Sequence, residues 1–208
     1  MKKLHIICAV ILNIFSLTAF AKIVETDEVQ ILIDESASWA IFAANVGGSI
    51  TDSPATMRPA GTTLIQNGLI YPKGTVDLSQ ESYLVDKHGQ PLTELNNIGT
   101  WQVVATELVS SDDLALGTIA AQESQTFRFN SNSETKPNQI FTLGNGQIIN
   151  DPAPQVAVSV TPMIVLGGTG KNQSAEGHAI AQVYVAPDGN SAIIVVKFDK
   201  KIKINIAC

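Results

Sequence analysis

Cysteine and charge are both scarce in this sequence, and each shortage excludes a class of protein. The 208 residues include two cysteines, Cys8 and Cys208, which excludes the disulfide framework of a small secreted domain. Only 15% of the residues are charged, and 19 acidic residues against 13 basic ones give a formal net charge of −6. An acidic chain repels a phosphate backbone, so we expect no nucleic-acid partner.

Hydrophobic residues, by contrast, make up 45% of the chain, which is enough to form a folded core. One apolar stretch, residues 4–20, follows two lysines, and Ala19-Phe20-Ala21 at its end supplies the small-x-small pattern of a cleavage site. This pattern predicts a signal peptide cleaved after Ala21, and the stretch is shorter than the roughly 20 residues that a spanning helix needs. We therefore expect Sec-type export to the periplasm or the extracellular space, and not an integral membrane protein.

The rest of the sequence is typical of β-strands separated by turns. Strands are predicted, from β-branched and aromatic residues, at 61–70, 101–109, 125–129, 139–143, 179–185 and 191–196. Turns are predicted, from glycine, proline, asparagine and aspartate, at 71–74, 87–91, 144–146, 151–154 and 187–190. Nearer the N-terminus, residues 29–33 favour a strand, whereas residues 39–45 fit either a strand or a short helix.

Two of these strands carry apolar residues on both faces, namely Ile193-Ile-Val-Val196 and Val103-Val104. A closed antiparallel barrel would bury the inner face, and a neighbouring subunit is the simplest cover for the outer face. The final run, Lys201 to Ile206, alternates isoleucine with polar residues and predicts a closing strand with one solvated face. We therefore expect an all-β barrel at 61–208, preceded by a segment at 22–60 and the signal peptide at 1–21.

The glycine-rich run that ends in Gly170-Lys171 is similar to a phosphate-binding loop, but its spacing is wrong. Val165 stands where that loop needs its first glycine, and Asn172 stands where it needs serine or threonine. The dinucleotide-binding pattern fails as well, because Gln173 occupies the place of its third glycine. We therefore expect these glycines to have a conformational role.

Signals for a metal or a nucleophile are weak. After the signal peptide the chain has two histidines, His88 and His178, and no Gly-x-Ser-x-Gly motif. The acidic pair Asp112-Asp113 lacks further oxygen ligands at regular spacing, so it fits a solvated turn better than a calcium site. We expect no metal and no cofactor.

Polar side chains within the predicted strands are the remaining candidates for a site. Carboxylates or imidazoles buried in a dry lumen suit proton transfer, because burial shifts a pKa. The candidates for catalysis are Glu107, Glu123, Arg128 and His178, and the candidates for ligand binding are Gln102 and Tyr184. For each of them the alternative is a polar residue that faces solvent.

Several short motifs resemble a known family. Val165-Leu-Gly-Gly-Thr-Gly170, followed by Ala175-Glu-Gly177, resembles the "GGTG…ARG" signature of dirigent proteins and the allene oxide cyclase barrel superfamily. A bacterial branch of that superfamily is similar at 61–64, 68–75, 98–101 and 126–129. The resemblance covers roughly 61–198, with Glu176 in place of the arginine of the signature and Asn172 in place of the aromatic residue that follows GGTG.

The resemblance implies an eight-stranded antiparallel barrel, commonly trimeric, with a mostly apolar cavity. Three functional hypotheses follow. The first is an exported barrel that binds a small apolar or amphipathic molecule in its lumen without catalysis. The second is a cyclase or isomerase of allene oxide cyclase or dirigent type, helped by a buried acid such as Glu107 or Glu123. The third is a structural, envelope-associated oligomer with a solid core.

Overall fold

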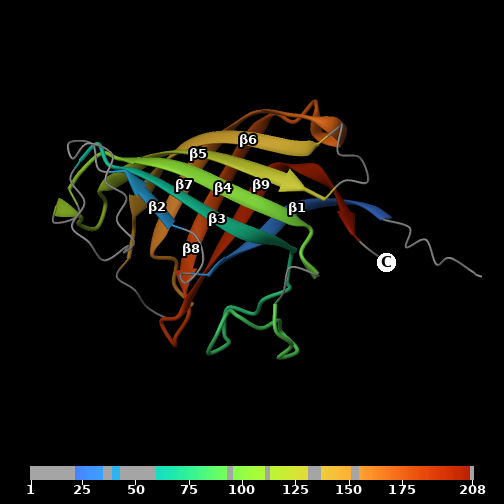
Figure 1. The fold of residues 1–208 in the computed structure, drawn as a ribbon, viewed down its shortest axis with the longest axis horizontal. Helices are drawn as coiled ribbons and strands as arrows, with labels where there is room; N and C mark the ends of the chain where they lie inside the picture. The colour runs from blue at the N-terminus through green and yellow to red at the C-terminus, as the bar shows by residue number, and fades with distance from the viewer. Residues whose placement is uncertain are drawn as a thin grey trace, which may run out of the picture.

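Each strand of this protein pairs with its neighbours in one antiparallel sheet that closes on itself (Figure 1). The computed structural model describes residues 22–34, 39–42, 60–92, 96–110, 113–130, 137–150 and 155–206. Its strands are β1 (Lys22–Asp34), β2 (Trp39–Phe42), β3 (Thr63–Pro72), β4 (Gly99–Glu107), β5 (Ile119–Phe129), β6 (Asn138–Ile148), β7 (Ser159–Gly168), β8 (Gly177–Val185) and β9 (Ser191–Ile206). The proposed signal peptide and Cys208 lie outside the described residues.

Eight of the strands form a closed barrel, as predicted. From β3 to β9 each strand pairs with the next one along the chain, and β9 pairs with β1. The pairing of β1 with β3, in a register from Val29↔Pro72 to Leu32↔Leu69, completes the circle. β2 pairs with residues 63–66 of β3, whereas β1 pairs with residues 69–72, so β2 and β1 follow one another along the same edge of β3. β1 and β2 both come from the segment expected to lead into the barrel.

The prediction of a turn at 144–146 is wrong, because β6 runs without a break through both of its glycines. A side chain at Gly144 would collide with the carbonyl oxygen of Pro162 on β7. A side chain at Gly146 would meet the Glu123 carboxyl group. The two glycines therefore allow neighbouring groups to approach β6 closely, which is a recognised use of glycine inside a strand.

The prediction of a solvated polar face on the last strand is also wrong in part. Ile202 and Ile204 are buried and Lys201 is exposed, as the alternation predicts. Asn205 is buried as well, because its side chain accepts a hydrogen bond from Lys171 Nζ and donates one to the carbonyl of Asn130. The asparagine can be buried because its donor and acceptor are both paired.

The outer face of the barrel is covered in part by residues 73–92, which we name the strap and which extends beneath the barrel in Figure 1. Ile193 is fully buried in a cluster that includes Tyr83 and Val76 of the strap. At this position the outer cover comes from the same chain, not from the neighbouring subunit that we expected. Val104, on the outer face of β4, is 38% exposed within this chain.

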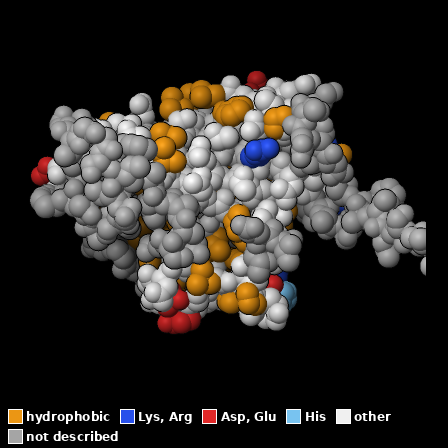
Figure 2. Space-filling view, viewed as in Figure 1, with side chains coloured by type: hydrophobic (Ala, Val, Ile, Leu, Met, Phe, Trp, Pro, Cys, Tyr) orange, Lys and Arg blue, Asp and Glu red, His pale blue; other side chains and the backbone are white. Residues whose placement is uncertain are grey.

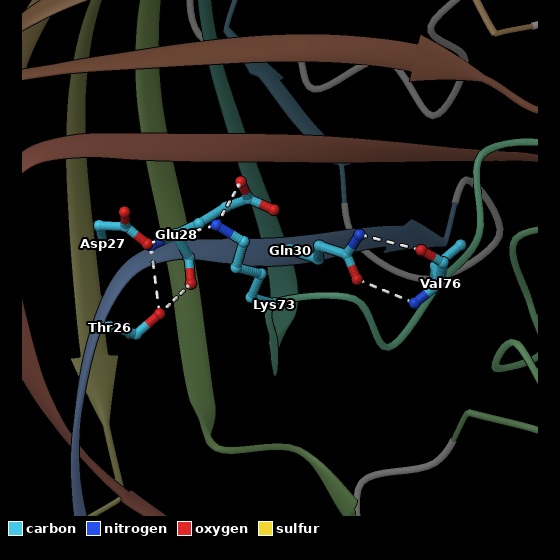
Figure 3. A network of polar contacts seen from close by, with 6 residues as sticks. All are labelled: Thr26, Asp27, Glu28, Gln30, Lys73 and Val76. Carbon is cyan, nitrogen blue, oxygen red and sulfur yellow. Dashed lines mark hydrogen bonds and ion pairs between the residues drawn. The ribbon is translucent and has the colours of Figure 1, made fainter.

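Polar groups of β1 hold the start of the strap (Figure 3). The Gln30 side chain donates to the Val76 carbonyl at 3.0 Å and accepts from the Val76 N–H at 2.8 Å. Lys73 lies 3.4 Å from Asp27 and 3.5 Å from Glu28, and these two acids raise the pKa of its ammonium group. The buried amide pair of Gln30 fixes the strap more firmly than the exposed ion pairs, since exposed pairs contribute little.

One end of the lumen is filled by side chains, and we name it the plugged end. Phe127 and Phe198 meet edge to face with ring centroids 5.5 Å apart. The short helix η3 (Gly170–Asn172) places Asn172 beside β9, where its side chain accepts from the Lys203 N–H and donates to the Lys203 carbonyl and to Asn138. The glycine-rich run thus delivers a buried asparagine that joins β6 to β9.

Aliphatic side chains remain on the outside of the barrel, and hydrophobic atoms are visible on the face drawn in Figure 2. Ile164 and Leu166 of β7 and Ile180 of β8 are 46%, 59% and 47% exposed. They share one outer surface, because β7 and β8 are paired with Ile180 opposite Pro162. The described residues contain no helix with the length and apolarity that a membrane span requires.

Candidate functional site

The end of the lumen opposite the plug is hollow, and we name it the hollow end. A cavity of about 230 Å³ lies there, where β1 ends and β9 begins. Aliphatic side chains of β1, β3, β4, β8 and β9 form most of its wall. Its polar lining consists of Gln66 on β3, Glu123 and Gln125 on β5, and Thr161 on β7, together with the indole of Trp101 on β4.

Short side chains account for this space. Ala105 of β4, Ala181 of β8 and Ala192 of β9 all point inward and line the cavity. At the plugged end, the inward side chains of Phe127 on β5 and Phe198 on β9 are far larger. The cavity therefore lies where the inward side chains of three strands are short.

A chain of hydrogen bonds crosses one wall of the cavity. The Trp101 indole N–H donates to Gln125 Oε1 at 3.0 Å, and Gln125 Nε2 donates to Glu123 Oε2 at 2.8 Å. The Thr161 side chain also hydrogen-bonds to the Glu123 carboxyl group. These bonds fix the position of one acidic group in an otherwise apolar lumen, and fixed polar groups of this kind orient ligands.

Burial raises the pKa of Glu123, because the surrounding protein removes water from its carboxylate. The hydrogen bonds from Gln125 and Thr161 oppose this effect, whereas the nearby Glu107 adds to it. Glu123 as a whole is only partly buried, since it lines the cavity. The result is a carboxylic acid that holds its proton to a higher pH than usual and is accessible from the lumen.

Gly146 leaves the space that this carboxyl group occupies. A Cβ atom at position 146 would collide with Glu123 Oε1 and would lie 3.4 Å from Thr161 Oγ1. The position of the acid therefore depends on a glycine on the adjacent strand β6, as well as on its hydrogen-bond donors.

Gln66 differs from the other polar groups of the lining. It is 6% exposed, yet its Nε2 has no hydrogen-bond partner among the described residues. An unpaired buried donor costs roughly 1–3 kcal/mol. Between Gln66 and Gln125 stands Val103 of β4, which pairs with both residues and carries no polar group of its own.

The structure separates the six predicted site residues into two groups. Glu107 and Glu123 face the lumen, in neighbouring strands and diagonal to each other. The other four lie on the outside of the barrel. These are Arg128 and Gln102, which are exposed, His178, whose side chain is 75% exposed and 3.7 Å from Asp199, and Tyr184, which packs against the cluster beneath the strap.

Sequence analysis missed three polar members of the lining. All three stand at inward positions: Gln66 and Gln125 lie in strands that were predicted at least in part, whereas Thr161 lies on β7, which was not among the predicted strands. The alternation of residues along β3 contains the signal, since Leu64, Gln66 and Ile70 have the same parity. That parity could not be assigned to the lumen until the closure of the barrel was known.

Two further hollows lie outside the lumen. One, of about 320 Å³, is a groove on the outer face whose lining includes the exposed residues Gln122, Ile164 and His178. The other, of about 110 Å³, lies beside η3 and is lined by four lysines, among them Lys171 and Lys200, which already bind Asn205 and Glu176. No group of three or more metal-binding side chains occurs among the described residues.

Comparison with known proteins gives structural matches only. No family model and no curated protein matches this chain. The structure is similar to that of the pterocarpan synthase dirigent protein GePTS1, with a TM-score of 0.47, 18% identity and 90% of each chain covered. For the pterocarpan synthase dirigent protein PsPTS1 the TM-score is 0.46 and the identity 16%, over 90% of this chain and 97% of the other. The strand pairing of this chain establishes its fold independently of these matches.

Proposed function

We propose that this chain binds a small, mostly apolar molecule in the hollow end of its barrel. The observation that carries the proposal is a cavity with aliphatic walls and a few fixed polar groups, which is the usual composition of a ligand site. A solid core would instead have favoured a purely structural role. Here the lumen is solid only at the plugged end.

The volume limits the size of the ligand. A dry protein cavity of about 150 Å³ accommodates benzene, so a cavity of about 230 Å³ suits a molecule of roughly ten non-hydrogen atoms. A longer molecule would have to extend out of the hollow end. We therefore expect a compact ligand, or the compact apolar end of an amphipathic one.

We also propose export through the N-terminal signal sequence and self-association into a trimer. The charge and hydropathy pattern of residues 1–21 supports export. The exposed aliphatic side chains Ile164, Leu166 and Ile180 support an interface between copies on the outside of β7 and β8. N-terminal sequencing of the exported protein and light scattering test these two proposals.

Catalysis by proton transfer is a second candidate, favoured by the lumenal acid Glu123. A carboxyl group with a raised pKa keeps its proton to a higher pH than usual, which suits it to donate that proton to a bound substrate. In this role the barrel would be an isomerase or a cyclase. Deuterium incorporation into the methyl group of acetophenone in D₂O, compared between the native protein and Glu123→Gln, separates it from binding alone.

Titration with isopropylbenzene, observed by ¹H–¹⁵N NMR, tests the binding proposal. We expect a saturable shift of the Trp101 indole resonance, because this N–H lies in the cavity wall. Ala181→Leu should abolish the shift by filling the cavity. An unchanged spectrum of the folded native protein up to the solubility limit of the probe would overturn the proposal.

A further inference from the structure

Gln66 supplies the starting point, because it lines the same cavity as Glu123 and its buried Nε2 has no hydrogen-bond partner among the described residues. The two residues stand on strands two apart, and these strands lie roughly 10 Å from each other. Gln66 is level with Gln125, and Glu123 lies two residues further along β5. Ala105 of the intervening strand pairs with Glu123 and is too short to fill the space between them. Any molecule in the cavity therefore lies beside a donor on one wall and a carboxyl group on another.

We propose that the ligand presents a neutral hydrogen-bond acceptor, a carbonyl oxygen of a ketone, ester or amide, to Gln66 Nε2. This inference rests on the proposed function and specifies the polar group of the ligand. A purely apolar molecule would leave Nε2 unpaired in a dry cavity, at the cost of an unsatisfied donor. A carbonyl oxygen would accept the free N–H and leave the rest of the molecule against the aliphatic wall.

Charge in the lumen excludes the other polar classes. Glu107 and Glu123 both face inward, and the described lining of the cavity contains no lysine or arginine. A carboxylate or phosphate ligand would lose its hydration and would meet no cation in this lining. An ammonium ligand would be attracted to Glu123 but would meet the donor Nε2 rather than an acceptor. A neutral acceptor is the class that satisfies Gln66 without adding a buried charge.

The test uses three probes with the same number of non-hydrogen atoms, namely acetophenone, isopropylbenzene and 1-phenylethylamine. Their dissociation constants are measured from the shift of the Trp101 indole resonance, which Trp39→Phe distinguishes from the second indole. Because the probes differ in hydration, the quantity of interest is the ratio of the acetophenone affinity to the isopropylbenzene affinity. This ratio is compared between the native protein and its variants.

Gln66→Met removes the donor and keeps the length of the side chain. One neutral hydrogen bond corresponds to a roughly three- to tenfold change in affinity, so we expect the ratio to fall by about that factor. Gln102→Met is the matched control, since Gln102 lies on the outer face of β4, and it should leave the ratio unchanged. Gln66→Met should unfold at the same or a higher urea concentration, because it replaces an unsatisfied buried amide.

The outcomes distinguish this inference from the proposed function. If isopropylbenzene and acetophenone both bind and Gln66→Met leaves their ratio unchanged, the acceptor inference is wrong and the binding site stands. If 1-phenylethylamine binds the native protein more tightly than acetophenone, the lumen selects a cation and the inference is again wrong. If no probe binds the folded protein, the proposed function itself fails.

Discussion

The plugged end and the hollow end are built from the same eight strands, yet one is filled and the other holds a cavity. At the plugged end, phenylalanines on β5 and β9 meet in the lumen, and the side chain of Asn172 hydrogen-bonds to the backbone of β9. At the hollow end, alanines on β4, β8 and β9 face the same lumen. In this barrel the space for a ligand therefore coincides with small side chains at a few inward positions, and large side chains fill the opposite end.

Breaking the plug should have the largest effect. Asn172→Ala removes three hydrogen bonds and leaves buried partners on Asn138 and Lys203. We expect the free energy of unfolding to fall by about 3 kcal/mol, measured by urea denaturation. Asn67→Ala removes an exposed hydrogen bond on the outside of β3 and serves as the control. Equal losses in the two variants would show that the network does not hold the plug.

A pair of alanines on β8 compares the two ends directly. Ala179 and Ala181 both point inward and are each 2% exposed, but only Ala181 lines the cavity. Ala179→Leu should lose about 2 kcal/mol of stability, because its added atoms enter a filled core. Ala181→Leu should change stability little, since the cavity accepts the larger side chain. Thermal or urea unfolding of both variants measures the difference, and a larger loss for Ala181→Leu would contradict the comparison.

Titration of the hollow end should give a smaller effect. Folding raises the pKa of Glu123 above its ordinary value of 4.5, so the native state binds more protons than the unfolded chain above that pH. The contribution of Glu123 to stability is then greatest below pH 4.5 and is lost as the pH rises through the folded pKa. Glu123→Gln should flatten this decline and gain on the order of 1 kcal/mol at pH 8.

Urea unfolding at pH 5 and pH 8 measures the effect of Glu123→Gln. Glu176→Gln is the matched control, because Glu176 is exposed and Lys200 lowers its pKa. It should not flatten the decline. If the free energy of unfolding falls between pH 5 and pH 8 by the same amount in Glu123→Gln as in the native protein, the Glu123 carboxyl group keeps its ordinary pKa.

Strand positions were the most predictable part of the fold. β-branched runs predicted β3, β4, β8 and the two halves of β9, because composition alone separates them from the turns. The first half of β5, which reads Ile-Ala-Ala-Gln-Glu-Ser, lacks that composition and is a strand because β4 and β6 flank it. Gly144 and Gly146 led to the wrong prediction of a turn. Their role depends on groups of the neighbouring strands that approach β6 closely, and the sequence of β6 alone does not show these groups.

The candidate site was only half predictable. Sequence reasoning selected acidic residues, and it identified Glu107 and Glu123 as candidates without knowing that both face the lumen. His178 and Arg128 were predicted on the same grounds, but both lie on the outer face of the barrel. Successive residues of a strand point to opposite faces, so a shift of one position moves a side chain from the lumen to the outside. Gln66 was missed because an amide in an apolar run carries no signal until its missing partner is seen.

The pairing of β1 with β9 joins the two extremes of the described chain, with Lys22 opposite Ile206. A newly made chain can pair β1 with β3 and assemble β3 through β8 as successive hairpins, but the long pairing of β1 with β9 must wait until β9 has been synthesised. Contacts so distant in sequence slow folding, and until they form the open sheet has two unpaired edges that can recruit other strands. The closure that creates the lumen is therefore the last event in folding, and the interval before it is the period of greatest risk of aggregation.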